Sequence, residues 1–269
     1  MLTAGIDVGS TATKAVLFDG EIIGSVVMPT GWNPREAGLE AFEKVMEQSK
    51  VARHQVKKVI GTGYGRISLP FIDKKVTEIT CHARGAKYLF TQTGTVIDIG
   101  GQDSKVIAVN EDGSVADFVM NDKCAAGTGR FLQVMTGVLD ITLEELGELG
   151  LRAEPASINS MCTVFAESEI IGLLAQGVSK EAIASGVIST IARKLYGLTA
   201  RVPFNSEITF TGGVANNQAI CRMLSGSLGV EFNVPAEPQI VGALGAAIIG
   251  YEQKQKNDRG EIIETGNHE

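Results

Sequence analysis

The sequence has few cysteines, and none are spaced as CxxC. Its four cysteines, Cys81, Cys124, Cys162 and Cys221, are spread through 269 residues, which is too sparse for a disulfide scaffold. Zinc ribbons and thioredoxin-like redox motifs both need the missing CxxC spacing. The simplest interpretation of Cys81 and Cys221 is that each is a small, buried apolar residue.

A basic block and a long apolar run are also missing. The net charge is −7, so we expect neither nucleic acid nor an anionic membrane as a partner. The longest apolar stretch, VGALGAAIIGY, is too short to span a bilayer. A secretory signal has a basic stretch followed by an apolar one. The first ten residues have no such basic stretch. These observations predict a soluble protein of the cytoplasm.

One sequence pattern occurs twice. GIDVGSTATKAVLFDG and VIDIGGQDSKVIAVNEDG each contain strand-like residues, an Asp-x-Gly turn, a Lys seven residues after the Asp and a second strand-like run. A later strand enters the glycine turn TGGVANN. Helical spacing is found over residues 35–50, 124–140, 162–176 and 180–200. The expected fold class is α/β with two related halves.

A strand that ends in Asp-x-Gly can hold a phosphate. Glycine leaves backbone N–H groups open to phosphate oxygens, and the Asp can hold a hydrated Mg²⁺ against them. Each turn alone is equally consistent with a structural hairpin, but two of them with the turn TGGVANN form a stronger set. The sequence contains no GxxxxGK[ST], which excludes a Walker-type loop.

The order DVGSTATK, DIGGQDSK, TGGVANN and a C-terminal GALGAA helix resembles the nucleotide-binding fold of actin, sugar kinases and heat-shock chaperones, with two duplicated ribonuclease-H-like domains. The resemblance implies domain I at 1–92 plus 242–256, domain II at 93–241 and a polar tail at 257–269. It implies that Asp7 and Asp98 act on Mg²⁺ and water. ATP or ADP would be bound by Gly9, Ser10, Thr11, Lys14, Gly100, Gly101, Gly212, Gly213 and Asn216.

Three further polar residues have less defined roles. Gln102 or Asp103, beside the second turn, could orient the hydrolytic water or simply face solvent. Glu167, in FAESE, could reach the ribose.

Cys124 and Cys162 each precede an apolar, helix-like run, in NDKCAAGTGRFLQVM and NSMCTVFAESEIIGLL. A helix N-terminus stabilises anions and so favours ligation by a thiolate. An iron–sulfur cluster held by four thiolates would need two chains, each supplying two across a two-fold axis. Buried or merely reactive thiols are the alternative that the spacing leaves open.

Both cysteine contexts, with GTGYGR and IDIGGQDSK, resemble the activator ATPases of 2-hydroxyacyl-CoA dehydratases and of related benzoyl-CoA reductase systems, over residues 5–251. The resemblance implies a homodimer with one bridging [4Fe–4S] cluster on Cys124 and Cys162. It also implies a ferredoxin or flavodoxin as electron donor. ATP would drive one electron to a low-potential metalloenzyme, either a dehydratase or a double-cubane cluster protein.

Two other functions remain open from the residues alone. A small-molecule kinase of the same fold, of the amino-sugar type, would keep the two turns but leave the cysteines unexplained. A chaperone or assembly module would need a peptide-binding domain, for which the chain has little room. The sequence assigns no role to the loop 61–66.

Overall fold

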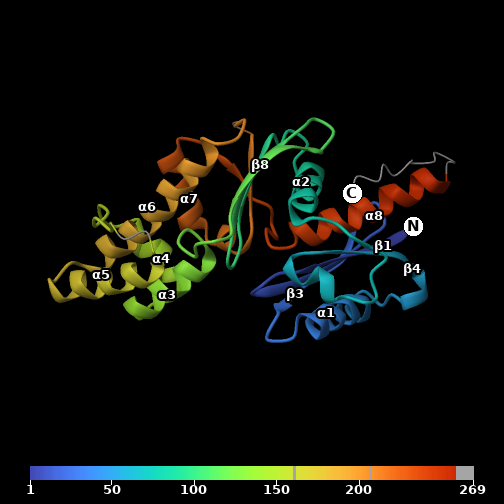
Figure 1. Ribbon diagram of the computed structural model, residues 1–269, viewed down its shortest axis with the longest axis horizontal. Helices are drawn as coiled ribbons and strands as arrows, with labels where there is room; N and C mark the ends of the chain where they lie inside the picture. Colours follow the sequence, from blue (N-terminus) through green and yellow to red (C-terminus); the bar gives the residue numbers. More distant parts are fainter. Residues whose placement is uncertain (160–161, 206, 259–269) are drawn as a thin grey trace. The chain divides into compact units, whose positions relative to one another are not determined.

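Two five-stranded sheets organise the chain, and both carry helices (Figure 1). The computed structural model describes residues 1–159, 162–205 and 207–258, and it confirms the α/β class. The chain divides into two compact units, Met1–Gly85 with the segment from Gly242 onwards, and Ala86–Val241. Most of the predicted polar tail, 259–269, lies outside the described residues.

The first unit is built on a sheet with the strand order β3-β2-β1-β4-β5. Its strands are β1 (Leu2–Val8), β2 (Ala12–Phe18), β3 (Ile22–Pro29), β4 (Val56–Thr62) and β5 (Lys74–Lys75). The helices are α1 (Pro34–Gln48), α2 (Glu78–Leu89), which continues into the second unit, α8 (Val241–Asp258), and the short 3-10 turns η1 (Arg53–Gln55) and η2 (Tyr64–Ser68).

The second unit repeats this strand order as β8-β7-β6-β9-β10. Its strands are β6 (Thr95–Ile99), β7 (Ser104–Val109), β8 (Val115–Asn121), β9 (Ile208–Thr211) and β10 (Phe232–Asn233). The helices are α3 (Gly129–Leu139), α4 (Leu143–Gly150), α5 (Thr163–Ala175), α6 (Lys180–Thr199), α7 (Gln218–Leu228) and the 3-10 turn η3 (Gly213–Asn216).

The duplication extends to the strand register. Asp7 lies opposite Lys14 in the β1–β2 pair, as Asp98 lies opposite Lys105 in the β6–β7 pair. The parallel neighbours match as well, because Asp7 pairs with Thr62 of β4 while Asp98 pairs with Thr211 of β9. The two sequence repeats are therefore two copies of one strand unit.

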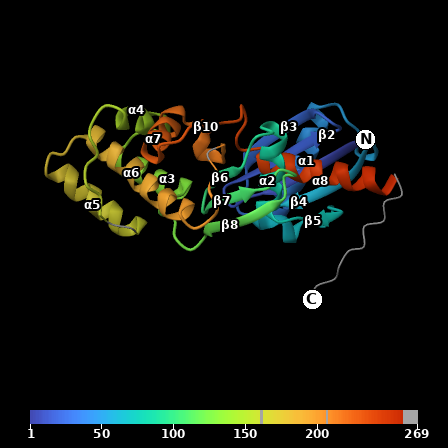
Figure 2. The ribbon, with the colours of Figure 1, turned by 90° about the horizontal axis from the view of Figure 1, so that it is seen from above.

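The units differ in what joins the third and fourth strands. In the first unit a single α-helix, α1, follows β3 and leads to β4. In the second unit the four helices from α3 to α6 lie between β8 and β9, and they cluster together in space (Figure 2). Cys124 and Cys162 both belong to this insertion.

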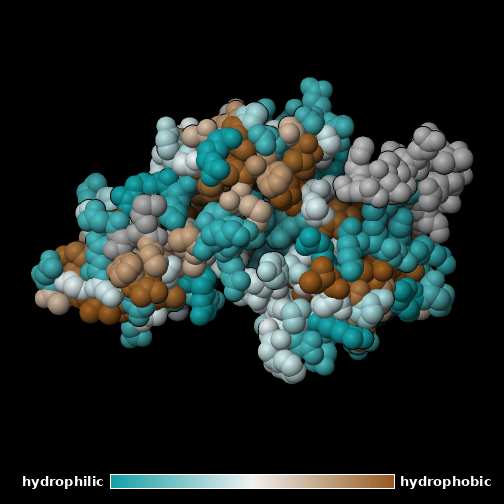
Figure 3. Space-filling view, viewed as in Figure 1, coloured by the Kyte–Doolittle hydropathy of each residue, from teal (hydrophilic) through white to brown (hydrophobic). Residues whose placement is uncertain are grey.

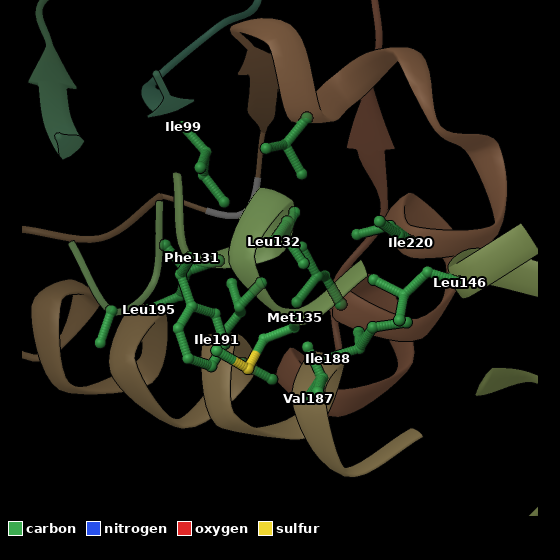
Figure 4. Packing of buried hydrophobic residues seen from close by; sticks show 14 of the residues in the cluster. Ile99, Phe131, Leu132, Met135, Leu146, Val187, Ile188, Ile191, Leu195 and Ile220 are labelled. Atoms are coloured by element: carbon green, nitrogen blue, oxygen red, sulfur yellow. The ribbon is translucent and has the colours of Figure 1, made fainter. Parts of the chain in front are cut away.

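The insertion packs into the apolar core of the second unit. Phe131, Leu132 and Met135 of α3 point towards α6, and all three are fully buried (Figure 4). The same cluster contains the buried residues Val187, Ile188, Ile191 and Leu195 of α6, Leu146 of α4 and Ile220 of α7. Full burial of one such side chain contributes about 1.5–3 kcal/mol, so α3 and α6 are held as one packed layer.

The predicted helix 124–140 begins too early. The structure has a turn after Cys124, where the amide of Thr128 donates to the carbonyl of Ala125 at 3.0 Å. Gly127 then takes a φ of +91° and Thr128 is extended, so the helix begins only at Gly129. The separate helix α4 was missed; Asp140, at a φ of +51°, ends α3, and Thr142 with Glu145 forms a capping box that starts α4.

Small residues let α8 lie very close to its neighbours. A β-carbon at Gly5 of β1 would collide with the backbone of Ala243, and one at Gly245 of α8 would collide with the carbonyl of Cys81. The small residues of GALGAA therefore have a packing function within the first unit. None of the helices in the described ranges is both long and apolar enough to cross a lipid bilayer.

Gly245→Ala should destabilise the protein by about 1–3 kcal/mol, because backbone atoms of α2 occupy the space of the new methyl group. Gly197→Ala in α6 is the matched control, since nothing lies within 4 Å of its added β-carbon. Alanine there should be neutral or stabilise the helix by up to about 1 kcal/mol. Urea unfolding of both variants checks this, and equal midpoints would contradict the packing argument.

Candidate functional site

Asp7 carries a buried carboxylate at the end of β1. It is 1% exposed, and its Oδ2 accepts from Nζ of Lys14 at 3.1 Å. Its Oδ1 has no hydrogen-bond partner within the described parts of the chain. An unpartnered buried carboxylate oxygen is costly, so this atom is suited to a water or a cation that arrives with a ligand.

Glycines keep the surroundings of Asp7 open. Gly63, with a φ of +79°, lies so close that a β-carbon would collide with Oδ1 of Asp7. A β-carbon at Gly242 would be 3.3 Å from Oδ2 of Asp7 and 2.9 Å from Nε2 of His82. The open oxygen and this glycine-lined space fit a hydrated Mg²⁺.

His82 is a polar residue of this region that the sequence interpretation missed. It is 4% exposed and lies on α2. Its only sequence signal was its place beside Cys81 in a helical stretch.

Asp98 has the corresponding position in the second unit but a different set of partners. Its Oδ2 accepts from Nζ of Lys105 at 3.2 Å, and its Oδ1 accepts from the hydroxyl of Thr211 at 2.9 Å. Lys105 is 1% exposed and also pairs with Asp103 at 2.8 Å. Lys105 was not among the expected site residues, although the repeated Lys spacing marks it.

The two aspartates are therefore not equivalent. Both oxygens of Asp98 have partners in the second unit, whereas one oxygen of Asp7 has none within the described residues. Of the four carboxylate oxygens of Asp7 and Asp98, only Oδ1 of Asp7 lacks a partner among the described residues.

Both predicted phosphate turns are tight hairpins. The amide of Gly9 donates to the carbonyl of Ala12 at 3.1 Å, and the amide of Gly100 donates to that of Asp103 at 3.0 Å. The tips are accessible, because the expected ligand residues Ser10 and Thr11 are exposed, as is Gln102. Gly101 is half-buried.

The third glycine turn follows β9. Gly212 has a φ of +90°, and a β-carbon there would lie 2.9 Å from Oδ1 of Asp98. Gly213 and Asn216 form η3, and the exposed Asn216 donates to Gln239 at 3.1 Å. Glu167 lies elsewhere, on α5, five residues after Cys162.

The loop 61–66 is the counterpart of this turn in the first unit. Gly63 follows β4 and lies against Asp7, just as Gly212 follows β9 and lies against Asp98. The sequence signal was present in the shared Thr-Gly that ends each strand, but its first occurrence had not been matched to the second.

The second hairpin is bonded to the start of α3. The amide of Gly129 donates to the carbonyl of Gly100 at 2.9 Å, and the amide of Arg130 donates to that of Gly101 at 2.8 Å. These are the first two residues of α3. Two backbone hydrogen bonds therefore join the hairpin to the helix that follows Cys124.

Cys124 and Cys162 have different local structures. Cys124 is half-buried in the loop before α3, where Nδ2 of Asn121 donates to its carbonyl at 2.8 Å. Cys162 is exposed at the N-cap of α5, as its sequence context predicts. A cavity of about 620 Å³ is lined by residues of both cysteine loops, Lys123 on one side and Asn159 on the other. The loop segments that precede the two thiols therefore lie in one region.

Cys81 and Cys221 do not belong to that region. Cys81 is fully buried, and desolvation raises its thiol pKa to about 12. Burial likewise raises the pKa of the Cys221 thiol to about 11. Both are protonated near neutral pH, as expected of small core residues. The accessible donor set is one half-buried and one exposed thiol, which fits two ligands of a shared cluster.

Helix α5 exposes apolar side chains just after Cys162. Val164, Phe165 and Ile171 are 66%, 69% and 54% exposed, and hydrophobic surface gathers over this helix (Figure 3). Apolar side chains gathered on the surface beside Cys162 are typical of a protein–protein contact.

Comparison with known proteins places this geometry among ATPases. Residues 4–250 match the sequence profile of the BadF/BadG/BcrA/BcrD ATPase family. The activator of lactoyl-CoA dehydratase from Anaerotignum propionicum is 44% identical over 259 residues, covering 95% of this chain and 100% of the relative.

Two solved structures are close over nearly the whole chain. Component A of the (R)-2-hydroxyglutaryl-CoA dehydratase from Acidaminococcus fermentans has a TM-score of 0.91 at 41% identity, covering 95% of this chain and 100% of that one. The activator of 2-hydroxyisocaproyl-CoA dehydratase from Clostridium difficile, with bound ADPNP, has a TM-score of 0.89 at 38% identity, covering 99% and 100%.

A sugar kinase shares the fold alone. The ROK hexokinase from Thermus thermophilus is 17% identical with a TM-score of 0.53, covering 94% of this chain and 100% of that one. Together these likenesses confirm the actin-like ATPase fold predicted from the two repeated turns.

Alkylation of the metal-free protein at pH 8 should modify Cys124 and Cys162 much faster than the other two cysteines. Cys81 and Cys221 are buried and, with pKa values of about 12 and 11, carry almost no thiolate at that pH. Peptide mass spectrometry after timed iodoacetamide treatment measures each site. Denatured protein is the control, in which all four should react; rapid labelling of native Cys81 would contradict the structure.

Proposed function

Because the chain belongs to the BadF/BadG/BcrA/BcrD ATPase family, we propose that it couples ATP hydrolysis to one-electron transfer. In this proposal a ferredoxin or flavodoxin supplies the electron to a [4Fe–4S] cluster shared by two copies of the chain. The acceptor is a low-potential metalloenzyme, a 2-hydroxyacyl-CoA dehydratase or a double-cubane cluster protein. The observation that carries the proposal is the direct bonding of the second phosphate hairpin to the helix that follows Cys124.

Each unit supplies a hairpin suited to binding phosphate. The exposed tips of the two hairpins offer backbone N–H groups to phosphate oxygens. Lys14 adds a positive charge at the first hairpin, and the open oxygen of Asp7 would accept a water of Mg²⁺. The glycine turn at 212–213 would bind the nucleoside.

Coupling would run through the backbone of the second unit. A phosphate that displaces the Gly100–Gly101 hairpin would also displace Gly129 and Arg130, because their amides donate to the hairpin carbonyls. Cys124 lies four residues before the N-cap Thr128, so its position depends on the position of α3. Through this connection the bound nucleotide would change the position of Cys124 without touching it.

Two copies would complete the cysteine site. Each chain offers two accessible thiols, and a cluster held by four thiolates supplies a one-electron carrier of low potential. The exposed apolar residues Val164 and Phe165 next to Cys162 support a contact between two copies at this place.

The acceptor is proposed from the relatives. The activators from Anaerotignum propionicum and Clostridium difficile are named for CoA-thioester dehydratases, so an acceptor of that kind is the first to test. The alternative of an amino-sugar kinase has weaker support, because the ROK hexokinase shares only the fold.

Asp7→Asn should lower the kcat of ATP hydrolysis by about 10² or more, since removing one electrostatic contact to a transferring phosphoryl group commonly has that effect. Asp98→Asn should also lower it. Asp19→Asn, at an exposed turn of the same unit, is the control and should leave kcat unchanged. Phosphate release measures all three, with iron content recorded in parallel; wild-type turnover of Asp7→Asn would refute the site.

Protein purified without oxygen should be brown and contain about four iron atoms per dimer, because each chain supplies two accessible thiols. Cys124→Ser and Cys162→Ser should each lose the iron, whereas the matched control Cys221→Ser should keep it. Iron analysis combined with light scattering checks the ratio. Iron retained in Cys162→Ser would be inconsistent with a shared cluster, whereas colourless, iron-free protein would favour the kinase.

A further inference from the structure

We propose that Lys194 of α6 stabilises negative charge on the sulfur of Cys124 and thereby raises the reduction potential of a cluster bound there. The inference rests on the proposed function, because it concerns the cluster that Cys124 would hold. Lys194 acts through the cysteine and is therefore a positioning residue. Nothing in the sequence pattern had pointed to it.

The contact is direct. Nζ of Lys194 lies 3.6 Å from Sγ of Cys124, within the range of an N–H donor to sulfur. Hydrogen bonds to ligand sulfurs and the charge around them are two of the quantities that set the potential of iron–sulfur clusters. An ammonium group in this place supplies both.

The loop is shaped around the lysine stem. Gly127, three residues after Cys124, has a φ of +91°, and a β-carbon there would be 3.1 Å from Cδ of Lys194. The aliphatic part of Lys194 thus fills the space that a larger residue at 127 would take. The stem thus packs against the loop while the ammonium contacts the sulfur of Cys124.

The helix that carries Lys194 is firmly held. Its neighbours Ile191 and Leu195 are buried in the core shared with α3 (Figure 4). The adjacent Arg193 donates to the carbonyl of Ile158 at 2.7 Å, in the loop that leads to Cys162. Consecutive residues of α6 therefore contact the two loops that bear the cysteines.

Most of the charged residues around Lys194 are also positive. The cavity beside it is lined by the cations Lys123, Arg193, Lys194 and Arg201 and by one acid, Asp122. This concentration of positive charge occurs in a chain whose net charge is −7. Positive charge near a redox centre favours the state with one more electron, so this site is arranged to accept an electron.

The arrangement would also let nucleotide binding change the reduction potential of the cluster. Cys124 precedes α3, which is bonded to the second hairpin, whereas Lys194 is on α6. Any movement of the Cys124 loop relative to α6 changes the distance between Nζ and Sγ. A longer distance weakens the stabilisation and makes the centre a stronger reductant.

The test is an anaerobic redox titration of the iron-loaded dimer, followed by electron paramagnetic resonance. Lys194→Met should lower the ratio of reduced to oxidised cluster at a fixed potential at least tenfold, which is about 59 mV for a one-electron couple. Lys194→Arg keeps the charge and should stay close to wild type. Lys180→Met is the matched control on the same helix, since Nζ of Lys180 donates to the carbonyl of Leu139 and lies fourteen residues away, about 21 Å along α6.

The outcomes separate this inference from the proposed function. An iron-free wild-type dimer would overturn both. Iron-loaded wild type with an unchanged potential in Lys194→Met, or an equal shift in Lys194→Arg and Lys180→Met, would overturn the role of Lys194 alone. If Lys194→Met retains its circular dichroism but loses iron, and Lys194→Arg keeps it, the charge on residue 194 is needed for the cluster, which supports the inference.

Discussion

The buried pairing of an aspartate with a lysine across a β-hairpin is the interaction on which both sheets depend. A carboxylate inside a protein must be paired, and losing one partner of a buried pair commonly costs about 3–5 kcal/mol. In the second unit Lys105 and Thr211 occupy both oxygens of Asp98. In the first unit Lys14 pairs with only one oxygen of Asp7. The same strand unit is thus complete in one copy and open to a ligand in the other.

This asymmetry assigns different tasks to two residues that look alike in the sequence. Asp98 mainly holds its own hairpin in shape, because Lys105, Asp103 and Thr211 form a closed network around it. That hairpin in turn holds α3 through the carbonyls of Gly100 and Gly101. A rigid hairpin transmits a displacement to the helix better than a loose one would. Asp7, with its open oxygen and glycine surroundings, is the better candidate for contact with a cation.

The sequence predicts the parts of this structure that follow from repetition. The Asp-x-Gly turn and the Lys seven residues later define a hairpin register, and the structure pairs Asp7 with Lys14 and Asp98 with Lys105 in that register. The short strands β5 and β10, of two residues each, have no periodicity to detect. Local patterns show a Thr-Gly at the end of β4 and of β9, but the parallel pairing of distant strands is needed to show that Gly63 and Gly212 are equivalent.

The cysteine site shows where local patterns mislead. An apolar run after Cys124 predicts a helix from that residue, but Gly127 adopts a φ of +91°, with the stem of Lys194 packed next to it. That contact joins residues 67 positions apart, so no short window of sequence contains it. Cys162 lacks such a distant constraint within the described residues, and its helix begins where the pattern predicts.

The insertion between β8 and β9 is the feature that distinguishes the second unit from the first. The first unit shows that one helix is enough to connect the corresponding strands. The second unit uses a four-helix insertion that packs against its sheet, and both accessible thiols lie in this insertion. The amides of Gly129 and Arg130 bond the insertion to the second hairpin. In the proposed function the duplicated sheets bind the nucleotide, and the cysteine site responds to it through the attachment of the insertion to the second hairpin.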